Sequence, residues 1–157
     1  MSFSNQKIVK IELLYQVQEN ISPEQKQERS IAVYDLMENN SFHLIGHKGP
    51  YHLYLSKQTR HLLFEIKSLK EIPINSFYLA LGPFRKLIRD YNQICDSYYD
   101  AIRTKPPSQI QAIDVGRKAL HDEGANLVIE RLRGKIEIND DTARRLFTLI
   151  SILRSKQ

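Results

Sequence analysis

The sequence has little of what usually reveals a function. It contains one cysteine, Cys95, so no disulfide can form within the chain. The first twenty residues hold no long apolar run, and we expect neither a signal peptide nor a membrane-spanning segment. Zinc-binding HExxH, paired-cysteine, calcium-loop, G-x-S-x-G and phosphate-loop motifs are all missing from it. We therefore expect no metal site, no cofactor and a cytoplasmic location, with Cys95 as a small buried hydrophobic residue.

What is present is an ordinary globular composition with a modest basic excess. Hydrophobic residues make up 41% of the 157 positions and charged residues 26%, which predicts one soluble domain with its own core. The net charge of +5 is uneven, because residues 1–81 carry 9 basic and 8 acidic side chains whereas residues 82–157 carry 14 and 10. This imbalance permits an anionic partner, although dedicated nucleic-acid modules usually show denser basic patches.

The first half of the chain is expected to be rich in strands. Apolar and polar residues that alternate along the chain predict strands at 8–15, 41–45, 51–56, 61–67 and 76–81. A hairpin turn is predicted at 57–60. One helix interrupts them, because Ser22-Pro23-Glu24-Gln25 is a helix start signal. Strands this close in sequence predict antiparallel pairing, since a parallel crossover needs a dozen residues or more.

The second half is expected to be helical. Two long amphipathic helices are predicted, the first from Gly82-Pro83 to just before Pro106. The second is expected to be capped by Ser108 and to stop at Gly134. A last helix is expected to open at Asn139 or Asp140.

Two glycines inside the second long helix, Gly116 and Gly124, predict either close packing against a neighbour or a break. A short extended piece at 136–138 follows that helix. The order of strand, helix, strand meander and helices predicts an α+β fold. We expect an antiparallel sheet of about four to five strands against three to four helices, in one domain with a strand-rich part at 1–81 and a helical part at 82–157.

Many basic residues of the helices have an acidic partner three or four positions away, whereas Arg85 and Arg89 have none in reach on their own helix. They are like charges one turn apart, in the first two turns of a helix, where the helix dipole disfavours cations. Lys86 adds a third charge, which Asp90 partly offsets. This arrangement predicts compensation by a carboxylate on another element or by a bound anion. The candidate anion-binding residues are Arg85, Lys86 and Arg89, and we call these three the basic helix surface. Secondary candidates outside that surface are Arg117, His121, Arg144 and Arg145.

The histidines offer two further hypotheses. His121 precedes Asp122 and Glu123, and this group could supply acid–base chemistry, although adjacent residues of a helix point about 100° apart. His52 and His61 flank the predicted hairpin turn and could face each other across the hairpin. Two imidazoles need a third ligand to make a metal site, so exposed polar residues are the simpler interpretation.

Several segments resemble one known bacterial family. They include 28–36 (ERSIAVYDL), 83–85 (PFR), 94–99 (ICDSYY), 120–124 (LHDEG) and 141–147 (DTARRLF). The chain is similar over nearly its whole length to uncharacterised protein family two-six-two of alphaproteobacteria. The resemblance implies a cytoplasmic, single-domain bacterial protein, and it implies no activity, because no reaction or site is assigned to that family. A hydroxyl residue often precedes Pro-Phe-Arg in the family, whereas Gly82 stands there in this chain.

Taken together, these observations predict a binding or regulatory module without catalysis. Its basic helix surface would meet an anionic partner, namely a nucleic acid, a phosphorylated ligand or an acidic protein. One alternative is a small enzyme that uses His121 with Asp122 or Glu123. The other is a structural protein that forms a homodimer through the helix that carries Tyr98 and Tyr99, whose aromatic rings are also a potential stacking surface for nucleic acid.

Overall fold

The computed structural model describes residues 5–14 and 21–154, and it has the predicted α+β architecture. The main sheet has the strand order β1 (Ile8–Leu14), β3 (Tyr51–Gln58), β4 (His61–Lys67) and β5 (Pro73–Ala80). Two short strands pair with each other, β2 (Phe42–Leu44) and β6 (Ile136–Ile138). The helices are α1 (Pro23–Glu38), α2 (Arg85–Thr104), α3 (Pro107–Leu132) and α4 (Asp140–Arg154), with a 3-10 turn at Gly82–Phe84 before α2.

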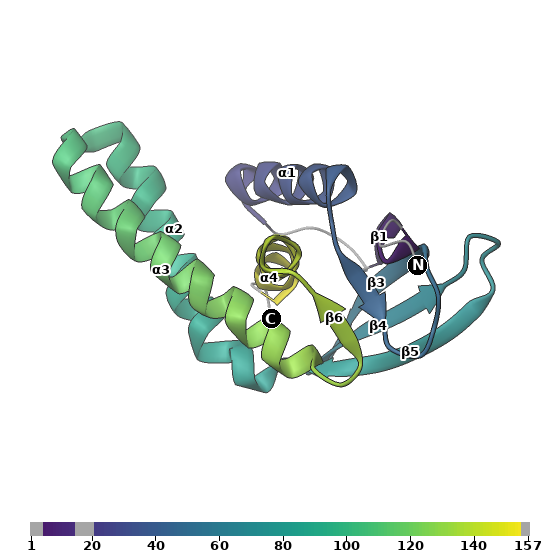
Figure 1. Ribbon diagram of the computed structural model, residues 1–157. Helices are drawn as coiled ribbons and strands as arrows, with labels where there is room; N and C mark the ends of the chain where they lie inside the picture. Colours follow the sequence, from purple (N-terminus) through teal and green to yellow (C-terminus); the bar gives the residue numbers. More distant parts are fainter. Residues whose placement is uncertain (1–4, 15–20, 155–157) are drawn as a thin grey trace.

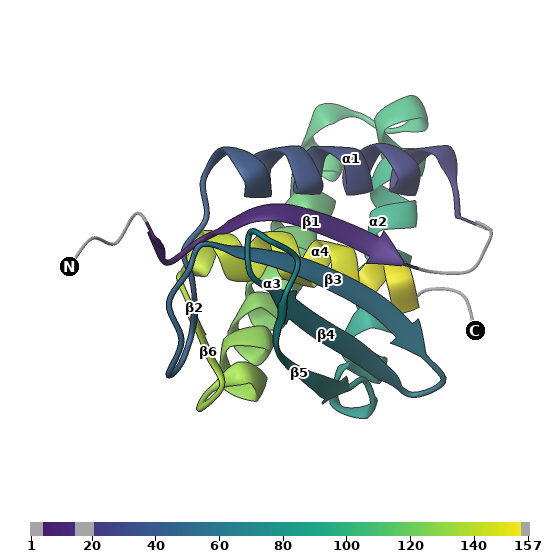
Figure 2. The same ribbon diagram turned by 90° about the vertical axis from the view of Figure 1, so that its right-hand side faces the viewer.

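Helix α4 lies between the sheet and the α2–α3 hairpin (Figure 1), and it packs against both α1 and α3. Helix α1 lies along the same side of the sheet as α4 (Figure 2) and also contacts β1. One hydrophobic core joins these elements, with fully buried residues from both halves of the chain, among them Leu36, Phe64, Phe84 and Phe147. Within the described residues, no helix is long and apolar enough to cross a membrane.

Strands β3, β4 and β5 pair antiparallel, as their short connections predicted, but β1 pairs in parallel with β3. Helix α1 and strand β2 lie between those two strands in sequence, which gives enough chain for a parallel crossover. The α+β class is confirmed, and the sheet is mixed rather than wholly antiparallel. The register also sets His52 opposite Lys67 and His61 opposite Gln58, so the expectation that the two histidines face each other is wrong.

Helices α1 and α4 begin at the predicted signals, whereas the predicted start at Gly82-Pro83 forms a 3-10 turn and α2 itself begins at Arg85. Ser22 Oγ accepts a hydrogen bond from Gln25 N at 3.0 Å, and the Gln25 side chain accepts one from Ser22 N, which completes the capping box of α1. Asn139 Oδ1 accepts a hydrogen bond from Thr142 N at 2.9 Å at the start of α4. Ser108 does not cap α3, because the helix already begins at Pro107, whose ring suits the first helical position.

The glycines of α3 mark close packing and not a break. The helix continues through both of them. A Cβ at Gly124 would lie 2.4 Å from the ring of Phe147 on α4, and a Cβ at Gly116 would lie 2.9 Å from Ile94 Cδ1 on α2. Helix α3 therefore approaches its two neighbours closely at these positions. Gly134, just beyond the end of α3, has a φ of +90°, the left-handed conformation expected of a helix stop.

Candidate functional site

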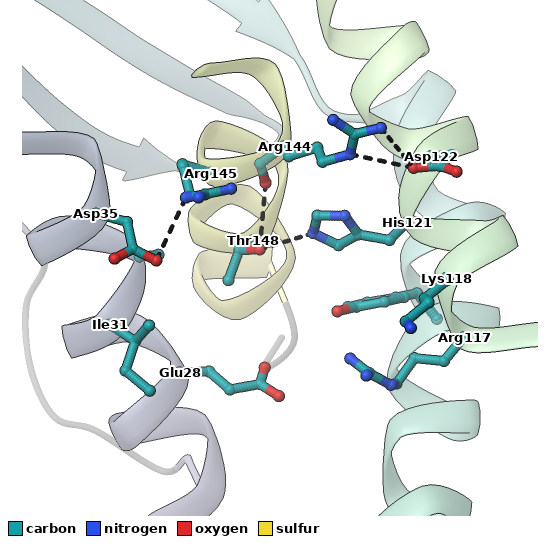
Figure 3. A pocket seen from close by; sticks show the side chains of 12 residues that line it. Glu28, Ile31, Asp35, Arg117, Lys118, His121, Asp122, Arg144, Arg145 and Thr148 are labelled. Atoms are coloured by element: carbon teal, nitrogen blue, oxygen red, sulfur yellow. Dashed lines mark hydrogen bonds and ion pairs between the residues drawn. The ribbon is translucent and has the colours of Figure 1, made fainter. Parts of the chain in front are cut away.

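A cavity of about 600 Å³ lies where α1, α3 and α4 meet, and we call it the interhelical groove (Figure 3). All four secondary candidates from the sequence, Arg117, His121, Arg144 and Arg145, line this groove. They come together because α3 and α4 pack against each other, while α1 forms the opposite side. Among the pockets of the described residues, this one is lined by ionisable side chains that were predicted to lie on two separate helices, α3 and α4.

His121 lies on the α3 side of the groove. Its Nε2 is 2.9 Å from Thr148 Oγ1 on α4, and that hydroxyl donates a hydrogen bond to the Arg144 carbonyl at 3.2 Å. His121 Nε2 is therefore the donor to Thr148, which leaves Nδ1 as an acceptor. Burial, together with the nearby Arg144 guanidinium, lowers the pKa of His121 to about 4, so the imidazole is neutral at pH 7.

The two arginines of α4 that line the groove differ in how well carboxylates satisfy their hydrogen-bond donors. Arg144 donates from Nε to Asp122 at 3.2 Å and from Nη1 to Asp141 at 3.3 Å. Arg145 makes no hydrogen bond to a described residue, and its buried Nε lies 3.5 Å from Asp35 Oδ2 on α1. A buried donor without an acceptor costs roughly 1–3 kcal/mol. The guanidinium of Arg145 is thus held near a carboxylate but is not satisfied by it.

The two cations of α3 that line the groove are paired within their own helix. Arg117 Nη2 lies 2.5 Å from Asp114 Oδ1, and Lys118 Nζ lies 3.3 Å from Asp114 Oδ2, as the helical spacing predicted. The hydrogen bond from Arg117 and the charge of Lys118 hold the pKa of Asp114 below its usual value. The Arg117 guanidinium also lies over the Tyr98 ring, 4.6 Å from its centroid.

The α1 side of the groove carries carboxylates. Glu28 and Asp35 are the charged residues that this helix contributes to the lining, and Figure 3 shows them across the groove from Arg117, Lys118 and His121. Glu28 accepts a hydrogen bond from the hydroxyl of Tyr99, whose pKa is raised by burial and by that carboxylate. Sequence reasoning missed Glu28, Asp35 and Thr148, because helical spacing finds partners within one helix and not across three.

The basic helix surface predicted from sequence does not converge on one site. Lys86 Nζ lies 2.9 Å from Asp90, and Arg89 Nε lies 3.9 Å from the same side chain. Arg85 forms no ion pair with a described residue and lines a different cavity, beside the β3–β4 turn. Glu123 lines a pocket with Lys86, so only Asp122, of the two carboxylates predicted to join His121, lies in the groove with it.

The remaining candidates are engaged within the chain. Cys95 is buried, as predicted, and burial raises the pKa of its thiol to about 11. Tyr98 and Tyr99 stack edge to face with ring centroids 5.8 Å apart. His52 contacts the Glu71 carboxylate. In the described part of the chain, no group of three or more histidine, cysteine or acidic residues is arranged to hold a metal ion.

Comparison with known proteins gives one consistent result. The model of the Uncharacterised protein family (UPF0262) matches residues 5–156 of this chain. A UPF0262 protein of Ruegeria pomeroyi is 49% identical over 138 residues, which cover 84% of this chain and 86% of the relative. A UPF0262 protein of Methylobacterium radiotolerans is 50% identical over 135 residues, which cover 86% of this chain and 84% of the relative. No solved structure is significantly similar.

Proposed function

We infer the function of this chain, which belongs to the Uncharacterised protein family (UPF0262), from its groove, because the names of its relatives state no activity. We propose a non-catalytic binding module whose interhelical groove holds a small molecule with one anionic and one cationic group. The observation that carries this proposal is the buried Nε of Arg145, which has no hydrogen-bond acceptor among the described residues. The groove volume of about 600 Å³ falls in the range of small-molecule sites.

Arg145 is the proposed partner of the anionic group. The other guanidiniums of the groove already donate to carboxylates, Arg117 to Asp114 and Arg144 to Asp122. Arg145 has only the 3.5 Å contact with Asp35. The Arg145 side chain is still 34% exposed and lines the groove, so a ligand carboxylate or phosphate oxygen can accept hydrogen bonds from its guanidinium. Hydrogen bonds between charged groups contribute roughly 1.5–3 kcal/mol each.

Glu28 is the proposed partner of the cationic group. Its described partner is a neutral hydroxyl, that of Tyr99, so its negative charge has no counter-charge in direct contact within the described residues. An ionised carboxylate has acceptor sites for several donors, and an ammonium group provides three. Because Glu28 on α1 and Arg145 on α4 line the same groove, a ligand that extends along it would meet both (Figure 3).

We do not extend the proposal to catalysis by His121 and Asp122. His121 uses Nε2 as a donor to Thr148, and Asp122 is bound by Arg144. With a pKa of about 4, this imidazole is a weak base at pH 7, whereas general catalysis favours a pKa near the working pH. The neutral ring supports a positioning role, in which it holds α3 and α4 at a fixed separation.

The proposal keeps the anionic partner predicted from sequence and narrows it to a small molecule in the groove. It also keeps the cytoplasmic location. It does not include a homodimer, because Tyr98 and Tyr99 already contact Arg117 and Glu28 within the chain.

The test is an NMR titration with three probes of similar length and different charge. These are 5-aminovalerate, which carries both charges, valerate, which carries the negative one, and pentylamine, which carries the positive one. We expect 5-aminovalerate to bind at least about tenfold more tightly than either single-charge probe, since each added charged contact contributes more than about 1.4 kcal/mol. The largest shifts are expected at Arg145 Nε–H and at the Thr148 amide.

Two variants test separately the contacts proposed for the anionic and the cationic group of the ligand. Arg145→Gln is expected to remove the advantage of 5-aminovalerate over pentylamine, and Glu28→Gln to remove its advantage over valerate. The matched controls are Arg131→Gln on α3 and Glu38→Gln on α1, which change the same charges at exposed positions outside the groove lining. Equal affinity for all three probes, or equal losses in the controls, would refute the proposal.

A further inference from the structure

A second cavity, of about 670 Å³, lies between the β3–β4 turn and the start of α2. Its lining includes Arg60 of the turn, His61 of β4, and Gly82 and Arg85 at the start of the helical half. Leu81 N donates to the Arg60 carbonyl at 3.0 Å, which ties the turn to the segment that leads into α2. This contact brings Arg60 and Arg85, which lie far apart in sequence, beside one cavity, which we call the basic cavity.

The charge of the basic cavity is of one sign. Its lining contains Arg60 and Arg85 and no acidic residue. The surrounding segments 57–64 and 76–89 also contain no aspartate or glutamate. Neither arginine forms an ion pair with a described residue, in contrast with Lys86 on the next position of α2, which is paired with Asp90. Two like charges around one cavity repel each other, and an anion between them would remove that repulsion.

The chemical groups of this cavity are hydrogen-bond donors. Besides the guanidinium groups of Arg60 and Arg85, the lining contains His61 and Thr59, whose imidazole and hydroxyl can also donate. A Cβ placed on Gly82 would meet no atom within 4 Å, so the backbone at this position is open to a ligand. Guanidinium forks bind phosphate oxygens in pairs, and this geometry is why arginine predominates in phosphate recognition.

We propose that the basic cavity is a second binding site, specific for the phosphate group of a small phosphorylated molecule. A phosphate monoester presents three charged oxygens, and the donors of Thr59, Arg60 and Arg85 reach the cavity from two separate segments of the chain. A carboxylate presents only two oxygens and a single charge, so it would leave part of this donor set unused. The site is independent of the interhelical groove, with which it shares no lining residue.

The experiment is a proton–nitrogen NMR titration of the full chain with inorganic phosphate at low ionic strength. We expect saturable shifts at the Gly82 amide and at the Nε–H groups of Arg60 and Arg85. Arg60→Gln and Arg85→Gln are each expected to weaken phosphate binding about tenfold. The matched control is Arg89→Gln, which removes the same charge one turn further along α2, outside the cavity lining, and is expected to change the affinity less than twofold.

A second arm replaces inorganic phosphate with a single-stranded oligothymidylate, which offers the same phosphate chemistry as a polymer. Binding of inorganic phosphate with the variant pattern above supports a discrete phosphate site. Oligothymidylate binding that Arg89→Gln weakens as much as Arg85→Gln does, without saturable binding of inorganic phosphate, would overturn the proposal in favour of an extended polyanion surface. The absence of saturable shifts with inorganic phosphate would also overturn it.

Discussion

The interhelical groove and the basic cavity both contain arginines, but the two sites differ in what surrounds those arginines. In the groove, Arg117 and Arg144 each have an aspartate within hydrogen-bonding distance. In the basic cavity, Arg60 and Arg85 have no acidic neighbour in the lining. Cations paired within the chain contribute to the structure, whereas cations that are clustered and unpaired indicate an external anion. Arg145, buried at Nε and only loosely paired, is the groove residue that most resembles the second case.

This difference also predicts different ligands for the two sites. The groove presents carboxylates on α1 and cations on α3 and α4, and therefore favours a molecule with both charges. The basic cavity presents positive charge alone and favours an anion of high charge density. Added salt should weaken phosphate binding at the exposed arginines more than ligand binding in the groove, because exposed charges are screened more strongly than buried ones.

The largest effect is expected from Gly124→Ala, which should disrupt the groove and spare the basic cavity. The new Cβ would lie 2.4 Å from the fully buried ring of Phe147, so α3 and α4 would have to separate. We expect the free energy of unfolding to fall by about 3 kcal/mol in urea denaturation, and 5-aminovalerate binding to be lost while phosphate binding persists.

Gly116→Ala is the matched control for that variant. Its Cβ would meet only the end of the Ile94 side chain, at 2.9 Å, and a rotation of that side chain can relieve the contact. Alanine also favours a helix over glycine by about 1 kcal/mol, which offsets the remaining strain. Equal destabilisation by the two variants would contradict the packing described for α3 and α4.

A smaller effect is expected from the protonation of His121 as the pH falls. The pKa of His121 is about 4 in the folded chain and near its ordinary value of 6.5 in the unfolded chain. Between these values the unfolded chain binds a proton that the folded chain does not, so stability decreases as the pH falls through this window. The loss should be roughly 2 kcal/mol by pH 5. His121→Gln, which keeps a donor for Thr148, should flatten the pH dependence of urea unfolding; an unchanged slope would contradict the buried, neutral imidazole.

The smallest effect is expected from Ser22→Ala, at the start of the helix that carries Glu28 and Asp35. The change removes the 3.0 Å hydrogen bond to Gln25 N, and loss of such a cap typically costs about 1 kcal/mol. Ser108→Ala should have no comparable effect on thermal unfolding, because Ser108 follows the proline that starts α3. A larger loss from Ser108→Ala would show that the helix boundary at Pro107 is misplaced.

Most of the secondary structure could be predicted from sequence, because helix capping, helix stops and strand alternation depend on residues close together in the chain. The capping box at Ser22, the stop at Gly134 and the alternation in β3 and β4 each depend on neighbours a few positions away, and each is confirmed. Chain proximity could not reveal the parallel pairing of β1 with β3, because two intervening elements separate them. The prediction that Ser108 caps α3 was wrong, because the helix begins earlier in the chain, with Pro106 at the N-cap and Pro107 as its first residue.

The candidate site was predictable only in part, for the same reason. Helical spacing identified the pairs Asp114–Arg117 and Asp141–Arg144, and both are present. Arg145, for which the same helical spacing offered Asp140 or Asp141, instead lies beside Asp35 of α1. That contact and the Glu28 side of the groove join segments more than 70 residues apart, so no pattern in the sequence could locate them. The unpaired charge of Arg85 was visible in the sequence. Arg60 of the β3–β4 turn reaches the same cavity only because β4 pairs with β5, and helical spacing, which compares residues of one helix, does not show that approach.

The most direct test of the account follows the Nε–H resonances of Arg145 and Arg85 in one sample. First 5-aminovalerate is added, and then inorganic phosphate. We predict that Arg145 responds to the first addition alone and Arg85 to the second alone, because the groove binds a molecule with both charges whereas the clustered cations of the basic cavity bind an anion of high charge density. Parallel responses of the two arginines to either addition would contradict the distinction between the interhelical groove and the basic cavity.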